Sequence, residues 1–261
     1  MDLFNEDHYV PKFLQRGWEA ESGHVWVHDV SAKQIRRQSI KTTGTTRGLV
    51  AFNQAWSHWE GKAAAAIRQL RKKKAPTQSS DYPYSDCQLP KTELEALHVF
   101  FWTLRTRCED SPQLWREPGQ AQVLRELIER GAAAFSPLIQ KYQLFQIWLR
   151  DGQHPFVLGT TTVFPLQPVQ ARGVLCLPIA ERTAVVVADK RIIQTLPLAW
   201  TGLDLGRVSC GTPSSLFILP RSLVGPPESW TALSEELCAL KREYQPRLLS
   251  TWSTPIDLRD P

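Results

Sequence analysis

The spacing of hydrophobic residues changes twice along this chain. Residues 18–29 alternate as a β-hairpin does, with a turn at Ser22-Gly23 and with Val25 and Val27 on the core side of the second strand. The middle of the chain repeats its apolar residues at helical intervals. Residues 155–220 contain short runs rich in Val, Thr and Leu, separated by prolines, which is typical of short strands. Strands on either side of a helical middle predict an α+β fold and not a series of βαβ units.

We therefore expect one α+β domain over residues 1–261, with an N-terminal β-hairpin, a central helical bundle and a C-terminal mixed or antiparallel sheet with a terminal helix. Its sub-regions are 1–50, 51–150 and 151–261. The predicted helices cover about 55–74, 91–107, 120–130, 137–149 and 229–244. The predicted strands after residue 150 are 155–158, 173–177, 183–188 and 216–219.

Composition excludes several classes of protein. With 42% hydrophobic and 22% charged residues, the chain is neither disordered nor collagen-like. No apolar run reaches the roughly 18 to 20 residues that a bilayer span needs, so we expect no membrane partner. The five cysteines lie at least 21 residues apart, which excludes a CxxC zinc site and a disulfide framework. The chain does not open with a secretory signal, so a cytoplasmic location is the default expectation.

The short motifs that announce a cofactor or a metal are also missing from the sequence. Phosphate loops, dinucleotide-binding glycines, serine-hydrolase elbows and zinc-protease helices are absent, and we predict no cofactor and no metal. His24 and His28 share one strand face with Trp26 between them, but their Cα atoms would be roughly 13 Å apart, too far for one ion to bridge easily. We expect that face to point toward solvent.

Positive charge is concentrated in the first third of the chain. The net charge is +5, and residues 1–76 alone carry 13 basic and 7 acidic side chains. The end of the first predicted helix carries a basic run that could neutralise several phosphates, formed by Arg68, Arg71, Lys72, Lys73 and Lys74. With Trp56 and Trp59 in the same helix, the run resembles a nucleic-acid surface interleaved with aromatic rings. The alternative is that both tryptophans face the core and that the run is a solvated helix end. Helical spacing favours the core position for the tryptophans, and it does not decide whether the lysines bind a partner.

Several motifs, in a fixed order, carry a resemblance to a known family. They are His8-x-x-Pro11-x-Phe13-Leu14-x-x-Gly17-Trp18, Val25–Asp29, Trp59-Glu60, Leu104-Arg105-Thr106, Pro155–Thr160 and Leu177–Ala180. Together they resemble the domain-of-unknown-function family 4238, of which this chain would be a divergent member. Gly159–Thr162 stands where the family has Ser-Asp-Asn-Pro, so its Asp is missing, and Arg107 replaces its usual proline. If that Asp serves chemistry in relatives, this chain would be altered or inactive.

Two functional hypotheses remain open at this point. The first is a nuclease-like or other phosphoester hydrolase of bacterial defence or conflict, with His8 as general acid or base, Arg105 binding a phosphate and Glu60 as a third catalytic residue. The roles follow from residue type, because the family supplies no activity. The second is a non-catalytic protein-binding module, such as an immunity or adaptor protein, whose abundant Trp and Arg dock a partner chain. The expected partners are accordingly nucleic acid, a nucleotide or a protein.

Overall fold

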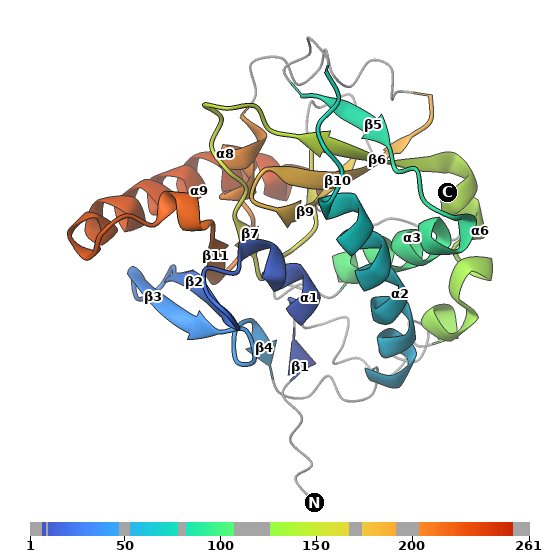
Figure 1. Ribbon diagram of the computed structural model, residues 1–261, viewed down its shortest axis with the longest axis horizontal. Helices are drawn as coiled ribbons and strands as arrows, with labels where there is room; N and C mark the ends of the chain where they lie inside the picture. Colours follow the sequence, from blue (N-terminus) through green and yellow to red (C-terminus); the bar gives the residue numbers. More distant parts are fainter. Residues whose placement is uncertain are drawn as a thin grey trace, which may run out of the picture.

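The protein has an α+β fold, which confirms the predicted class. The computed structural model describes residues 7–8, 10–46, 53–77, 82–106, 126–166, 174–191 and 204–252. Within these ranges there are two antiparallel sheets, of five and four strands, and helices flank them on opposite sides of the molecule (Figure 1). A third, two-stranded ladder pairs β1 (Asp7–His8) with β4 (Thr45–Thr46).

The five-stranded sheet has the order β5-β6-β10-β9-β8. Its strands are β5 (Tyr84–Asp86), β6 (Tyr142–Trp148), β8 (Phe164–Pro165), β9 (Leu175–Ala180) and β10 (Thr183–Asp189). The run Ala184–Ala188 is buried without a break because both faces of β10 are covered. Two helices, α2 (Asn53–Arg71) and α3 (Lys91–Thr106), pack against each other on one side of this sheet.

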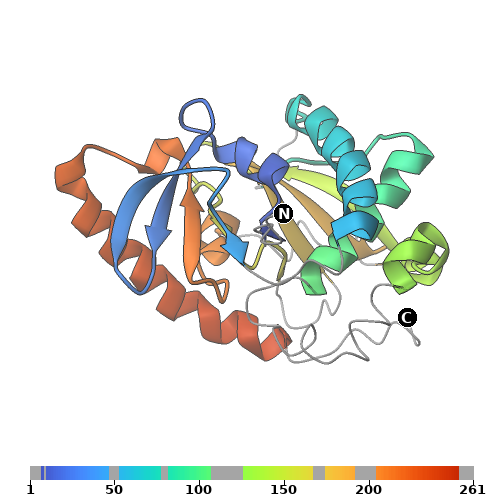
Figure 2. The same cartoon turned by 90° about the horizontal axis from the view of Figure 1, so that it is seen from below.

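The four-stranded sheet has the order β3-β2-β11-β7. Its strands are β2 (His24–Asp29), β3 (Gln34–Ser39), β7 (Leu158–Gly159) and β11 (Leu216–Leu219). Val25, Val27 and Ile218 point into the main core, whereas Phe217 and Leu219 form a smaller core with α9 (Trp230–Trp252). Figure 2 shows α9 along the outer side of this sheet. Both faces of the sheet are therefore covered.

Short helical segments connect these layers. They are α1 (Lys12–Gln15), η1 (Arg16–Trp18), η3 (Gly131–Ala133), α6 (Ser136–Lys141), α8 (Leu205–Ser209), η5 (Arg221–Leu223) and η6 (Pro227–Ser229). The pair α1 and η1 lies beside both sheets, and the buried Trp18 donates its indole N–H to the carbonyl of Phe156 at 2.9 Å. This bond satisfies a polar atom that burial would otherwise leave unpaired.

Most predicted elements are confirmed, with small shifts at their ends. The helices near 55–74 and 91–107 correspond to α2 and α3, and the terminal helix corresponds to α9, with Leu233, Leu237 and Leu240 buried. The strands at 173–177, 183–188 and 216–219 correspond to β9, β10 and β11. For the helix expected at 120–130, residues 126–130 are helical and the earlier part lies outside the described residues.

Two predictions in the N-terminal sheet are wrong. Trp18 belongs to η1, and the hairpin is formed by β2 and β3 around residues 30–33, while Glu21 and His24 make only an isolated bridge. His28 is also buried, because α9 covers the strand face that carries it. The prediction of a solvent face considered the strand alone and did not include the helix that packs on it.

Two further predictions fail in the second half of the chain. The helix expected at 137–149 ends at Lys141, and β6 follows at once, since Tyr142–Trp148 pairs with β10 along its whole length and tertiary pairing overrides the helical spacing. Residues 155–158 contribute only Leu158 to a strand. Pro178, expected between strands, lies inside β9, where it is tolerated because β8 pairs only as far as Cys176.

Candidate nucleic-acid interface

The C-terminal end of α2 carries the basic run. The helix buries the side chains of Trp56, Ala63, Ile67 and Leu70 against the core and ends at Arg71. Gln146 of β6 donates its side-chain N–H to the carbonyl of Leu70 at 2.9 Å, which fixes this end of α2 on the sheet. Cations near the last turn are favourable because the carbonyl end of a helix is negative. The local sequence therefore explains why the run ends the helix, but it does not say which cations stay accessible.

Arg71 is half-buried, and its guanidinium is bonded to three carbonyls of the protein itself. Its Nε donates to the carbonyl of Ile179 at 2.6 Å, and its Nη1 and Nη2 donate to the carbonyls of Phe13 and Leu14 at 2.9 and 2.8 Å. These bonds tie α2 to α1 and to β9. Burial lowers the pKa of Arg71 to about 10, with a further contribution from the neighbouring charges of Arg16 and Arg68. The guanidinium remains charged near neutral pH and serves the scaffold.

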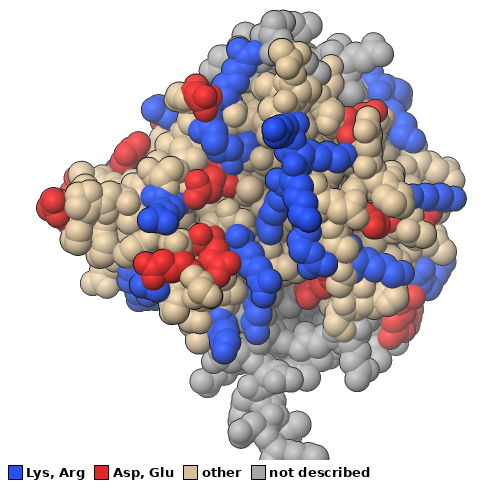
Figure 3. Space-filling view, in the orientation of Figure 1, with Lys and Arg blue, Asp and Glu red and all other residues tan. Residues whose placement is uncertain are grey.

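Exposed cations surround this half-buried guanidinium. Arg68, Lys72 and Lys74 are exposed at the end of α2, and Lys12 and Arg16 are exposed on α1 and η1. We call these five residues the basic surface. Figure 3 shows a band of Lys and Arg down the middle of this face, over α1 and the end of α2. Within the described ranges none of the five forms an ion pair with a carboxylate. Lys73 is half-buried, and its ammonium donates to the carbonyl of Gln88 at 3.1 Å.

The tryptophans of α2 do not belong to this surface. Trp56 is only 2% exposed, and Trp59 is half-buried with its indole N–H donated to the carbonyl of Ile128 at 2.9 Å. Gly131, with a φ of +53°, lies against the Trp59 ring so closely that a Cβ there would be 2.0 Å from Cζ2. The two rings thus hold α2 to its neighbours, as helical spacing predicted.

The three predicted catalytic residues lie on three different elements. His8 belongs to β1 and is paired with Thr45, Glu60 is half-buried in α2, and Arg105 lies in the last turn of α3. The packing of α2 against α3 brings the helices of Glu60 and Arg105 together. The side chains of His8 and Arg105 lie outside the described residues, as does all of Arg107, so their convergence stays a prediction.

The other histidines of the sequence hypotheses have structural partners. His28 Nε2 lies 2.9 Å from Ser234 Oγ of α9, and its ring stacks with Phe217 at 6.5 Å between centroids. Burial is the main cause that lowers the pKa of His28. His24 contacts the carbonyl of its neighbour Ser22 at 3.0 Å. Across the described ranges no group of three His, Cys, Asp or Glu residues could hold a metal ion.

The segment Gly159–Thr162, where the family pattern has an Asp, is buried among hydroxyl groups. Thr161 donates its backbone N–H to Ser214 Oγ at 3.0 Å and its hydroxyl to the carbonyl of Pro213 at 3.1 Å. A Cβ on Gly159 would lie 2.2 Å from Ser214 Oγ. The hydroxyl network fills this place and leaves no room for a larger residue at 159.

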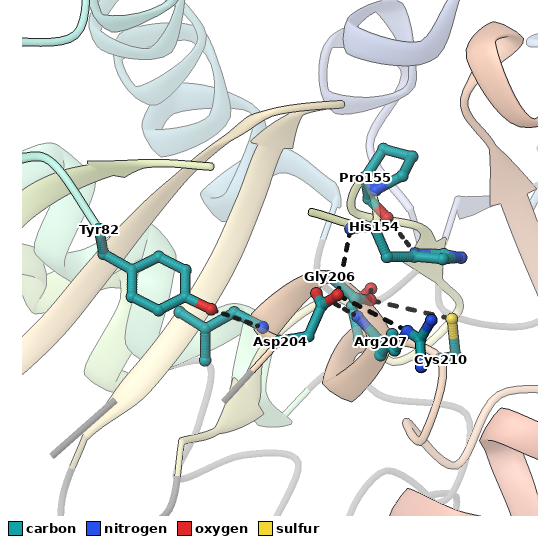
Figure 4. Close-up of polar contacts among 9 residues, drawn as sticks. Tyr82, His154, Pro155, Asp204, Gly206, Arg207 and Cys210 are labelled. Atoms are coloured by element: carbon teal, nitrogen blue, oxygen red, sulfur yellow. Dashed lines mark hydrogen bonds and ion pairs between the residues drawn. The ribbon is translucent and has the colours of Figure 1, made fainter. Parts of the chain in front are cut away.

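A second polar cluster, which sequence reasoning missed, surrounds the start of α8 (Figure 4). Asp204 accepts hydrogen bonds from the backbone N–H groups of His154 and Arg207, both at 3.2 Å, and Arg207 Nε lies 3.6 Å from the same carboxylate. Tyr82 Oη accepts the N–H of Leu205 at 3.1 Å. Burial raises the pKa of the Cys210 thiol well above its ordinary value, so the thiol is not a nucleophile. We call this group the α8 cluster; its charges are neutralised locally.

Two surface features lie at the face of the four-stranded sheet that α9 covers. Trp26 and Trp230 are half-buried and meet edge to face, with ring centroids 5.2 Å apart. An open groove of about 900 Å³ runs along α9 and the turn between β2 and β3, and it is lined by Lys33, Glu235, Cys238, Lys241 and Arg242 among others. Its lining mixes both signs of charge, which gives no preference for an anion or a cation.

In comparisons with known proteins, no family model, no curated protein and no solved structure matches this chain. The resemblance to family 4238 thus stays an expectation from the quoted motifs. Among the helices that the structure describes, none is long and apolar enough to cross a bilayer.

Proposed function

We propose that this protein binds nucleic acid through the basic surface formed by Lys12, Arg16, Arg68, Lys72 and Lys74. One observation carries the proposal: these exposed cations gather around the half-buried Arg71, and none of them forms an ion pair with a carboxylate of the residues that the structure describes. Like charges held together repel each other, and the repulsion is relieved when a polyanion replaces their counterions. Several cations of one sign on adjoining elements suit a phosphate backbone.

The alternative is that the run is an ordinary solvated helix end. Some exposed arginines elsewhere on this protein have local carboxylate partners: Arg37 lies 2.5 Å from Glu21, and Arg36 lies 3.7 Å from Asp29. The basic surface differs from those regions because, among the described residues, no carboxylate pairs with its cations. An anionic membrane is less well suited, because membrane-bound helices add exposed apolar side chains to their cations, whereas Phe13 of α1 packs on Phe100 with ring centroids 5.3 Å apart.

The test is fluorescence anisotropy with a labelled DNA duplex of about 20 base pairs, titrated at several salt concentrations. We expect the double variant Arg68→Gln/Lys72→Gln to bind at least about tenfold more weakly at low salt and to lower the slope of log K against log salt by about 2. Lys33→Gln/Arg242→Gln, which removes two exposed cations from the groove along α9, is the matched control and should bind like the natural protein.

Two results would overturn the proposal. The first is a natural protein that does not bind the duplex at low salt, or binds it with no dependence on salt. The second is co-sedimentation with anionic vesicles that requires Arg68 and Lys72 while nucleic acid does not compete for the protein. Equal loss in Arg68→Gln/Lys72→Gln and in Lys33→Gln/Arg242→Gln would show a net-charge effect only and would also remove the basic surface from the proposal.

The phosphoester-hydrolase hypothesis rests on the same surface and adds a chemical step. Its support is that Glu60 lies on α2, the helix that ends in the basic surface, and that α3 with Arg105 packs against α2. Incubation of bound DNA and RNA with divalent cations tests it: a phosphodiesterase should lose cleavage in His8→Ala and keep binding. If the natural protein binds nucleic acid and does not cleave it, the hydrolase hypothesis is wrong and nucleic-acid binding without catalysis remains. A cytoplasmic location belongs to the same proposal, since nucleic acid is accessible there.

A further inference from the structure

We infer that the basic surface recognises the phosphate backbone of a duplex and reads no bases. This inference rests on the proposed function and specifies its ligand: a double-stranded nucleic acid of any sequence, in preference to a single strand. The observation behind it is where the structure places the aromatic side chains beside the exposed cations. It agrees with the helical spacing, which favoured tryptophans that face the core over cations interleaved with aromatic rings.

Single-strand binding uses aromatic side chains as platforms on which unpaired bases stack. On α1, η1 and α2 the described aromatic residues are turned inward. Trp18 and Trp56 are 1% and 2% exposed. Phe13 packs on Phe100, and Trp59 is held by Ile128 and Gly131. Among the described residues of these three elements, an unpaired base would meet exposed cations, whereas the half-buried rings of Phe13 and Trp59 are packed against the protein.

Sequence reading in a groove needs side chains held in place so that their hydrogen bonds discriminate between base edges. The rigid guanidinium here is that of Arg71, and it is directed at three backbone carbonyls of the protein itself. Lys73 is likewise bonded to the carbonyl of Gln88. The cations that remain exposed are long side chains, and lysine in particular acts as a point charge. They can neutralise phosphates but supply little discrimination between bases.

Charge density then favours the duplex. A duplex carries a phosphate about every 1.7 Å along its axis, and neutralising each one releases more counterion than on a single strand. When stacking contributes nothing, this electrostatic gain decides the preference. The surface should therefore bind duplexes of different sequence with similar affinity, and the affinity should fall steeply with salt.

The experiment compares labelled probes of equal length, about 20 nucleotides, with the full chain: two duplexes of unrelated sequence, their separated strands, and oligo-dT and oligo-dA. We expect each duplex to bind at least about fivefold more tightly than its strands, the two duplexes to agree within about twofold, and oligo-dT and oligo-dA to bind alike. Inorganic polyphosphate should compete, because it supplies charge without bases. Phe13→Leu, which removes a half-buried ring beside the surface, should change none of these affinities.

A single strand that binds as tightly as the duplex, a preference for one homopolymer of more than about fivefold, or a loss of binding in Phe13→Leu with the fold retained would overturn the inference and leave nucleic-acid binding itself in place. A difference of more than about fivefold between the two duplexes would do the same, since it would show that bases or their shape are read. The absence of binding to every probe would instead remove the proposed function.

Discussion

The basic surface and the α8 cluster differ in whether their charged groups are paired with groups of opposite charge. At the α8 cluster, the carboxylate of Asp204 is surrounded by two backbone N–H groups and the guanidinium of Arg207, within 3.6 Å. At the end of α2, the guanidinium of Arg71 is surrounded by carbonyls, and the cations outside it have no carboxylate among the described residues. A charge that is satisfied locally stabilises the fold, whereas an unbalanced group of charges is available to a partner. The α8 cluster is thus scaffold, and the basic surface is the candidate interface.

The largest effect is expected when a glycine is replaced by alanine, and it should differ between α8 and α2, the helix that ends in the basic surface. In Gly206→Ala of α8, the new Cβ would lie 1.6 Å from the carbonyl oxygen of His154, so the backbone must move, and we expect a loss of at least about 3 kcal/mol in the free energy of unfolding. In Gly61→Ala of α2, the Cβ meets nothing within 4 Å, and the higher helix propensity of alanine should stabilise the protein by about 0.5–1 kcal/mol. Urea unfolding measures both, and equal effects would contradict the structure around α8.

Arg71 and Arg68 should separate scaffold from interface within three residues of one helix. Arg71→Ala leaves the carbonyls of Phe13, Leu14 and Ile179 without their donor, and we expect a loss of about 2–4 kcal/mol in the free energy of unfolding. Arg68→Ala should change stability by less than about 0.5 kcal/mol, because its side chain is exposed. Chemical denaturation of both variants gives the difference. A stable Arg71→Ala protein would mean that its guanidinium is not part of the scaffold.

A buried histidine gives the next largest effect, through pH. Burial, with a smaller contribution from Lys190, lowers the pKa of His98 to about 4, below its ordinary value of about 6.5. The unfolded chain therefore takes up a proton at a higher pH than the folded one. Stability is complete above about pH 6.5 and is lost as the pH falls toward 4, by about 2 kcal/mol between pH 7 and 5.

Urea midpoints at several pH values test this prediction. His98→Leu removes the titrating group and should flatten the pH dependence, with His28 accounting for part of what remains, because burial lowers its pKa as well. A variant whose stability falls with pH as steeply as that of the natural protein would show that His98 does not cause the loss.

The smallest effects are expected at two single charges, Asp204 and Arg68. One substitution should change stability and the other should change duplex binding. Asp204→Ala removes the side-chain oxygen that accepts the N–H of Arg207 at the start of α8, and it should cost about 1 kcal/mol and leave duplex binding unchanged. Arg68→Gln should leave stability unchanged and weaken duplex binding a few-fold. Thermal unfolding and anisotropy on the same samples measure both quantities. A binding loss in Asp204→Ala would assign the α8 cluster to the interface.

Hydrophobic spacing predicted helices that bury one face and strands that are buried on both faces. Ala63, Ile67 and Leu70 lie on one side of α2, and Val185–Val187 form a run that is buried on both faces of β10. It failed at β6, where Tyr142–Trp148 fits a helix or a strand by spacing and only the pairing with β10 decides. The same limit applied to His28, since its face is covered by α9 from about 200 residues further along the chain.

The sequence by itself determined the α+β class, the inward position of Trp56 and the place of the basic run at the end of α2, because these depend on local spacing and on charge near a helix end. Only the tertiary structure decided how the run is used. It bonded the guanidinium of Arg71 to carbonyls of α1 and β9, and it placed Lys12 and Arg16 beside the end of α2. Contacts between residues far apart in the chain select which cations are satisfied, and no local pattern encodes that selection.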